Sequence, residues 1–364
     1  MKYIDGFRNP AVAAAIRRRL ESLAASLQSA GRSVNVMEVC GSHTMAIARY
    51  GIRGVLPANV NLISGPGCPV CVTAARYIDV AIELAQRGAR VVTFGDMLPV
   101  PGSSSTLAEC RAQGGCVEVC YSPLRAVEVA EAHPDREVVF LAIGFETTIP
   151  PVISIVESAL RKGIKNVSLL TAFKLVPPAL QALLADPELK IDAFLCPAHV
   201  SAIIGADAYR PFAGERGVPC VIAGFEPLDI LYGLQGILEQ LVRGEATVEN
   251  RYARVVKSEG NRSAQELMAR YLQPVDAAWR GIGTIPASGL GLRPEFELFD
   301  AEKRHGVTVG LGSENAACRC GEVLKGKMRP PQCLLYGTAC TPDHPVGPCM
   351  VSAEGTCSAW YKYS

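Results

Sequence analysis

REVVFLAIGFE, residues 136–146, is an apolar run of strand length that ends in glycine, an aromatic residue and a carboxylate. Six further apolar runs occur along the chain: VNVMEVCG (34–41), VNLISGPG (60–67), ARVVTFGD (89–96), KNVSLLTAF (165–173), IDAFLCPAH (191–199) and VPCVIAGFEP (218–227). Short continuous apolar runs are typical of parallel strands that are buried on both faces. Helical stretches such as 74–88 and 151–163 separate them, so we predict an α/β fold with helices on both faces of the sheets.

A weak internal repeat indicates two similar halves. The repeated motifs are CGSH (40–43) with CPAH (196–199), and GFET (144–147) with GFEP (224–227). We therefore predict two small parallel-sheet α/β domains that face a cleft, spanning residues 31–122 and 123–245. The second copy contains Cys196 and His199, which we interpret as a decayed duplicate of the first site.

The two ends of the chain are predicted to form a third domain. Residues 10–30 place apolar side chains at helical spacing and end at Gly31. The strand pattern fades from about residue 245, and a Gly/Pro-rich stretch leads into a cysteine-rich tail. We expect residues 1–30 to pack with 246–364 as a mainly helical or irregular domain.

Composition excludes some classes of partner. Lys and Arg total 36 and Asp and Glu 35, which removes the charge expected of a nucleic-acid-binding surface. No signal peptide is visible, and no apolar run approaches the ~20 residues that cross a bilayer. We therefore expect no nucleic acid or membrane partner and a cytoplasmic location. Thiols stay reduced there, so clustered cysteines indicate metal or redox sites.

The tail concentrates cysteines. Six of the 14 in the chain fall in its last 47 residues: Cys318, Cys320, Cys333, Cys340, Cys349 and Cys357. Four thiolates can hold a 4Fe-4S cluster or a zinc ion, and spacing alone does not decide between them. The paired C-x-x-C knuckles typical of structural zinc are absent, which favours the cluster. Unliganded buried cysteines are the third alternative, which this density disfavours.

The motif CPVC places Cys68 and Cys71 at C-x-x-C spacing after Gly-Pro-Gly. The two sulfurs can form a disulfide, and a helix that begins near Thr73 would lower a thiol pKa through its amino-terminal dipole. The motif is consistent with redox activity or metal ligation, and equally with two buried thiols.

The motif CGSHT places Cys40 and His43 at a predicted strand-to-helix turn. Cys40 could ligate a soft metal as thiolate, and His43 could ligate it, donate a proton or orient a ligand. Cys–His nucleophilic catalysis is a competing interpretation. A helix cap by Ser42 or Thr44, with a packed cysteine and a surface histidine, is the structural alternative.

Two carboxylates end predicted strands, Asp96 in FGDMLPVPGS and Glu146 in GFETTIP. Ligands of open parallel sheets bind outside the carboxyl ends of the strands, so the loops of Cys40, Cys68 and these two acids are expected to meet in the cleft. The acids would relay protons or bind polar ligands there, or they cap helices.

Long motifs resemble the HypD family, the maturation proteins of NiFe hydrogenases. They are EVCGSHTMAIARYGIRGVLP (38–57), SGPGCPVCVT (64–73), TFGDMLPVPGS (93–103), GFETT (144–148), CGEVLKGKMRPPQC (320–333), GTACTPDHPVGPCMVS (337–352) and GTC (355–357). The resemblance covers nearly the whole chain. It implies two α/β domains around a cleft and a carboxyl-terminal 4Fe-4S domain.

The resemblance also implies a function. HypD proteins assemble the Fe(CN)2CO unit of the hydrogenase active site with the small chaperone HypC and with HypE, which delivers cyanide as a protein thiocyanate. Carried onto this chain, Cys40 would bind the iron, with Cys68 and Cys71 as the thiol pair at the same metal site. The cluster ligands would be Cys318, Cys333, Cys340 and Cys357.

We hypothesise that Cys68 and Cys71 cycle between dithiol and disulfide beside an iron held by Cys40 and a partner thiolate, with His43 assisting proton transfer. The cluster would return electrons to the pair. Such a protein is a redox-active assembly scaffold more than a conventional turnover enzyme. The alternatives are a cluster-fed thiol-disulfide oxidoreductase that needs no HypC, and a passive iron-delivery scaffold.

Overall fold

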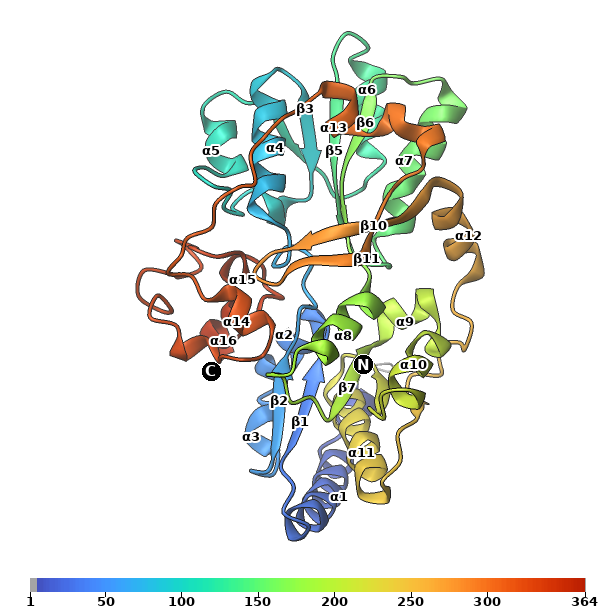
Figure 1. Ribbon diagram of the computed structural model, residues 1–364, viewed down its shortest axis with the longest axis vertical. Helices are drawn as coiled ribbons and strands as arrows, with labels where there is room; N and C mark the ends of the chain where they lie inside the picture. Colours follow the sequence, from blue (N-terminus) through green and yellow to red (C-terminus); the bar gives the residue numbers. More distant parts are fainter. Residues whose placement is uncertain (1–4, 364) are drawn as a thin grey trace.

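The computed structural model describes residues 5–363 as an α/β protein built on two parallel β-sheets (Figure 1). All seven predicted strand runs form strands, which confirms the fold class. The strands of these sheets are β1 (Val34–Glu38), β2 (Val60–Ser64), β3 (Arg90–Thr93), β4 (Val117–Val119), β5 (Val138–Gly144), β6 (Val167–Phe173), β7 (Ala193–Pro197), β8 (Cys220–Ala223) and β9 (Val248–Asn250).

Helices connect and cover the strands. Before the tail they are α1 (Pro10–Ser29), α2 (Gly41–Arg49), α3 (Ile52–Val55), α4 (Ala75–Gln86), α5 (Leu107–Ala112), α6 (Arg125–Ala132), α7 (Ile149–Lys162), α8 (Val176–Ala185), α9 (Ala198–Ile204), α10 (Arg210–Gly214), α11 (Pro227–Arg243) and α12 (Arg262–Tyr271). In the part of the chain that the structure describes, no helix combines the length and the apolar character needed to span a bilayer.

The first sheet has the strand order β2-β1-β7-β8-β9, and every pair in it is parallel. Side chains alternate between its faces, as the pleat requires. Leu195 and Val221 pack with α1 and α11, whereas Phe194 and Cys220 pack with α8 and α10 on the other side. The prediction that the first helix packs with the tail is therefore wrong. The apolar stripe of α1 is buried against α11 and the sheet.

The second sheet has the order β4-β3-β5-β6 and is also parallel. Phe140 and Leu169 face α6 and α7, whereas Leu141 and Leu170 face α4. Burial of both faces explains why β5 is apolar at every position.

We predicted that the two α/β units divide at residue 122, and this prediction is wrong. The chain forms β1 and β2, then builds the whole second sheet between residues 75 and 173, and returns to the first sheet with β7. The register Met37↔Phe194 places β7 directly beside β1. All these strands are similarly apolar, so their composition does not reveal which of them pair.

A β-hairpin that the sequence did not predict lies between the two sheets (Figure 1). It consists of β10 (Leu272–Trp279) and β11 (Gly283–Leu292), which pair antiparallel. The sequence pattern did not predict these strands because they contain proline and glycine, which are unusual inside strands. Trp279 is buried, forms a β-bridge with Thr73, and donates from Nε1 to the Ser288 hydroxyl at 2.7 Å. The hairpin thus attaches the CPVC loop to both α/β units.

The cysteine tail consists of short helices joined by irregular backbone. The helices are α13 (Ala301–His305), α14 (Cys320–Leu324), α15 (Pro348–Val351) and α16 (Thr356–Tyr363). The tail packs against α2, and its buried cysteines share one apolar cluster with the CPVC cysteines and the inner faces of both sheets.

Two glycines allow the loops after β1 and β2 to touch. The Gly65 amide donates to the Glu38 carbonyl at 2.7 Å, and the Gly41 amide donates to the Gly67 carbonyl at 3.1 Å. A Cβ on Gly67 would overlap the backbone nitrogen and Cα of Cys40. Glycine is thus required for the contact between the Cys40 and Cys68 loops.

Gly67→Ala is expected to destabilise the protein by at least about 2 kcal/mol, because the clash is with backbone that cannot rotate away. Gly54→Ala is the control, since its Cβ would meet nothing within 4 Å. We expect the melting temperature measured by circular dichroism to fall by about 4–8 °C for the first variant only. Equal melting temperatures would contradict the tight contact.

Candidate metal and thiol site

Cys40 lies at the amino-terminal end of α2, directly after β1, and is 1% exposed. Its side chain forms no cap hydrogen bond, so its sulfur is not used by the helix. Its amide donates to the Glu38 carboxylate at 3.2 Å, which also accepts from the Thr44 hydroxyl at 2.6 Å. Burial is the main cause that raises the pKa of the Cys40 thiol, and Glu354 and Glu38 raise it further.

His199, not His43, faces the Cys40 sulfur. Both ring nitrogens of His199 lie 3.9 Å from Cys40 Sγ. His43 is fully buried, and its Nε2 donates to the Gly224 carbonyl at 2.9 Å. Phe225 contacts both imidazole rings, with centroid distances of 4.8 Å to His43 and 5.1 Å to His199. His43 is therefore a packed core residue, and His199 is the imidazole available to the thiol.

The charge state of the two histidines follows from their burial. Desolvation lowers the pKa of both His43 and His199 to about 4. His199 is therefore neutral at physiological pH, the form that ligates metals or accepts a proton.

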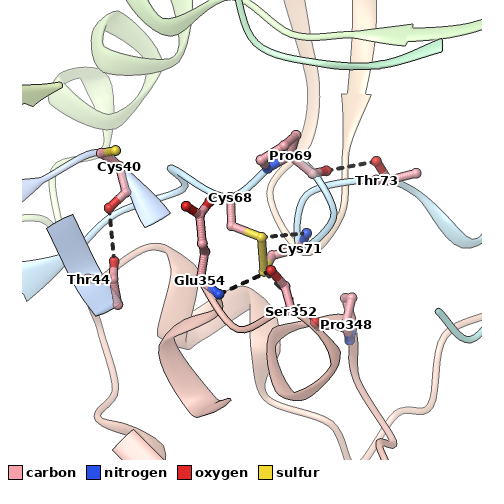
Figure 2. Close-up of a disulfide and its surroundings, with 9 residues drawn as sticks. All are labelled: Cys40, Thr44, Cys68, Pro69, Cys71, Thr73, Pro348, Ser352 and Glu354. Carbon is pink, nitrogen blue, oxygen red and sulfur yellow. Dashed lines mark hydrogen bonds between the residues drawn. A yellow bond between two sulfur atoms is a disulfide. The ribbon is translucent and has the colours of Figure 1, made fainter. Parts of the chain in front are cut away.

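Cys68 and Cys71 form a disulfide in the turn between β2 and α4, with a Cα–Cα distance of 5.2 Å (Figure 2). Both residues are buried. The Cys71 amide donates to Cys68 Sγ at 3.2 Å, and the Thr73 hydroxyl donates to the Pro69 carbonyl at 2.8 Å. The predicted C-x-x-C geometry is thus compatible with oxidation of the pair.

The cysteine tail contacts both thiol loops. Cys71 Sγ lies 3.8 Å from the carbonyl oxygen of Pro348, the residue before Cys349. The Ser42 hydroxyl donates to the Glu354 carboxylate at 2.6 Å. Figure 2 shows Glu354 reaching from the tail toward the Cys40 and Cys68 loops. The tail, the disulfide and the Cys40 turn therefore form one continuous site.

Five tail cysteines line a small cavity of about 10 Å³: Cys318, Cys320, Cys333, Cys340 and Cys357. No carboxylate or imidazole lines it. Cys349 is fully buried beside this cavity. Hydrogen bonds from the Cys320 and Cys349 thiols to the Cys357 sulfur lower the pKa of Cys357. Within residues 5–363, no three Cys, His, Asp or Glu side chains already stand in the geometry of metal ligands.

The donor set has the chemistry that an iron–sulfur cluster requires. Soft thiolates are the ligands that such clusters require. A Cβ on Gly347 would meet Cys318 Sγ at 2.5 Å and Cys320 Sγ at 2.7 Å, so glycine keeps this wall open. The Val346 amide donates to Cys340 Sγ at 3.4 Å, as amides do to cluster sulfurs.

Arg280 lies between the disulfide loop and the tail. Its amide donates to the Val72 carbonyl at 2.8 Å, and its buried guanidinium donates to the Pro101 carbonyl at 2.9 Å. The next residue, Gly281, packs against the backbone of Gly321 beside Cys320. A hydrogen bond with the Cys320 thiol is the main cause that raises the pKa of Cys318, whereas the positive charge of Arg280 lowers this pKa.

A family model for HypD, described as the hydrogenase formation hypA family, matches residues 13–364. The hydrogenase maturation factor HypD of Azotobacter vinelandii is 48% identical over 371 residues, which cover the whole of this chain and 97% of the relative. The chain belongs to the HypD family. HypD of Rhizobium leguminosarum bv. viciae is 44% identical, and HypD of Escherichia coli (strain K12) 41%, each over the whole of this chain and 96% and 98% of the relative.

The two carboxylates predicted to lie in the cleft follow strands of the second sheet, Asp96 after β3 and Glu146 after β5. Asp96 is exposed after β3, and no hydrogen bond joins it to Cys40, Cys68 or Cys71 in the described residues. Glu146 is 1% exposed, and its Oε1 accepts the Val176 amide at 2.8 Å. Glu146 thus caps the start of α8, which was the structural alternative for this residue.

Sequence reasoning about this HypD chain missed His199, Glu354 and Arg280 as site residues. The CGSH–CPAH repeat was a signal for His199, because it placed a second histidine at the end of a parallel strand. Nothing local marked Glu354 or Arg280, since both reach the thiol loops only through tertiary packing.

Glu146→Gln is expected to change the pH dependence of stability. Burial raises the pKa of Glu146 from 4.5 to about 7, so the folded protein holds a proton that the unfolded chain releases. The wild-type protein therefore loses stability as pH rises from about 4.5 to 7, by about 3 kcal/mol in total. The glutamine variant does not lose stability in this way. The melting temperature of the variant minus that of wild type should therefore be larger at pH 8 than at pH 5. Parallel curves, as expected for the exposed control Glu266→Gln, would contradict it.

Proposed function

We propose that this HypD-family protein is a redox-active scaffold that holds iron at Cys40 while cyanide and carbonyl ligands are added, in complex with a HypC-type chaperone and a HypE-type cyanide donor. The observation that carries the proposal is the position of the Cys68–Cys71 disulfide. It touches the tail through Pro348 and is joined to the Cys40 turn through Gly67 and Gly41. A two-electron thiol pair thus lies between a candidate metal ligand and a cysteine-lined cavity.

Iron is the cargo in this proposal, with Cys40 as its thiolate ligand and the Cys68–Cys71 pair beside it. Metal binding replaces the thiol proton, so the raised pKa of Cys40 keeps the sulfur protonated until a cation arrives. Neutral His199, 3.9 Å away, is placed to ligate the iron as an uncharged donor.

Release of cyanide from a protein thiocyanate needs two electrons, because the sulfur–carbon bond breaks to give a thiolate and a cyanide ion. Oxidation of the Cys68 and Cys71 thiolates to the disulfide supplies two electrons. The Cys68–Cys71 disulfide would be the oxidised half of such a cycle.

Cys318, Cys333, Cys340 and Cys357 are the proposed ligands of a 4Fe-4S cluster. When bound, the cluster would supply single electrons that reduce the disulfide. Cys320 also lines the cavity, and Cys349 adjoins it, so both are placed to hydrogen-bond ligand sulfurs. Arg280 fixes the spacing between the pair and the cavity through Val72 and Gly281.

Infrared spectroscopy of the protein purified without oxygen in complex with the HypC-type chaperone tests the proposal, since iron-bound cyanide and carbonyl give diagnostic bands. Cys71→Ser removes the disulfide, so we expect its cyanide bands to be lost. The control Cys116→Ser lies outside both cysteine groups and should keep them. Full cyanide bands in Cys71→Ser would disprove the redox cycle.

His199→Gln is expected to lower the iron retained by that complex several-fold, because the neutral imidazole beside Cys40 is lost. His199 makes no hydrogen bond that supports the fold in the described residues other than the contact with Cys40, so the melting temperature should change little. Iron analysis and thermal melts, with His133→Gln as the control, measure both effects. Unchanged iron content would remove His199 from the site.

A further inference from the structure

A polar pocket lies between the edge strand β2 and the cysteine tail. Its volume is about 280 Å³, and a hollow of about 230 Å³ adjoins it. Arg53, Asn61, Arg329 and Trp360 line both. Neither Cys40 nor the CPVC pair lines this pocket, so it is distinct from the site described above.

The pocket wall is cationic. Arg53, Lys327 and Arg329 line it, and no Asp or Glu does. Lys327 is already paired with Asp186 and Glu188 outside the pocket. Arg329, in contrast, has no carboxylate within 4.0 Å among residues 5–363. Because the whole chain has a formal net charge of only +1, this wall is a local concentration of positive charge.

The two arginines are close enough to repel. Burial lowers the pKa of Arg53, the charge of Glu38 behind it opposes this, and the charge of Arg329 lowers it further. Arg53 donates to the Ser64 hydroxyl at 3.1 Å and lies 5.1 Å from the centroid of the Trp360 ring, which holds the guanidinium in place. Its buried Nε has no hydrogen-bond partner in the described residues.

Amide and hydroxyl groups complete the wall. Asn35, Asn61, Ser64 and Gln332 line the pocket. In the described residues the amide nitrogens of Asn35 and Gln332 donate to no other group, so both can donate to a ligand. Guanidinium groups bind tetrahedral oxyanions through paired N–H donors, and a dianion between two arginines cancels their mutual repulsion.

We propose that this pocket binds a phosphate group, either free phosphate or a small phosphate monoester. The phosphate would lie between Arg53 and Arg329, with the side-chain amides of Asn35 and Gln332 as further donors. Its position would also link parts of the main site. Gln332 and Thr356 directly precede Cys333 and Cys357, and Ser64 ends the strand that leads to the CPVC loop. Bound phosphate would thus hold the tail against the first sheet.

Isothermal titration calorimetry of the full-length protein, purified without oxygen, tests the site with inorganic phosphate and with glycerol phosphate as probes. We expect saturable binding that Arg329→Gln weakens at least about tenfold, the loss typical of one charge-assisted contact. The matched control is Arg111→Gln, because Arg111 is exposed on α5 and remote from the pocket. Tighter binding of the ester identifies an organic phosphate as the ligand, and equal binding identifies free phosphate.

A thermal melt with and without phosphate checks the same site independently of activity, since a ligand that binds the folded state raises the melting temperature. The rise should occur in wild type and Arg111→Gln and be lost in Arg329→Gln. The proposal is overturned if wild type shows no saturable binding up to about 10 mM phosphate, or if Arg329→Gln binds as tightly as wild type.

Discussion

The hydrogen bond from the Gly41 amide to the Gly67 carbonyl is the contact on which the site depends. It joins the turn after β1 to the turn after β2, and so brings the Cys40 loop to the Cys68 loop. Parallel neighbours carry their loops at the same edge of a sheet, but ordinary side chains would keep the two backbones apart. Because Gly67 has no Cβ, the second loop packs directly on the backbone of Cys40.

The chain builds the second sheet between two visits to the first, and this topology explains why all parts of the site pack on one apolar core. The chain leaves the first sheet after β2, and the CPVC turn is the first segment of the crossing to the second sheet. The hairpin at Trp279 and the tail cysteines then pack on this crossing, in the apolar cluster that the inner faces of both sheets share. A disulfide in such a segment adjoins both α/β units and the tail at once.

The sequence predicted the strands and the cysteine groups, because both are local signals. It did not predict which strands pair, because β1 and β3 are equally suitable neighbours for later apolar strands. The hairpin from Leu272 to Leu292 was missed since its glycines and prolines break the strand pattern. His43 was preferred to His199 because it is close to Cys40 in sequence. In the fold, α2 turns His43 toward Gly224, whereas the end of β7 brings His199 to the thiol.

The electrostatics of Cys40 favour a metal ligand over a nucleophile. A Cys–His nucleophile needs a low thiol pKa and an imidazole that stays protonated. Here burial raises the thiol pKa of Cys40 and lowers the pKa of His199 to about 4, so the ion pair is disfavoured on both sides. The negative charges of Glu38 and Glu354 repel a Cys40 thiolate, whereas they attract a cation. A bound cation reverses this balance, because it stabilises the thiolate and offsets both carboxylates.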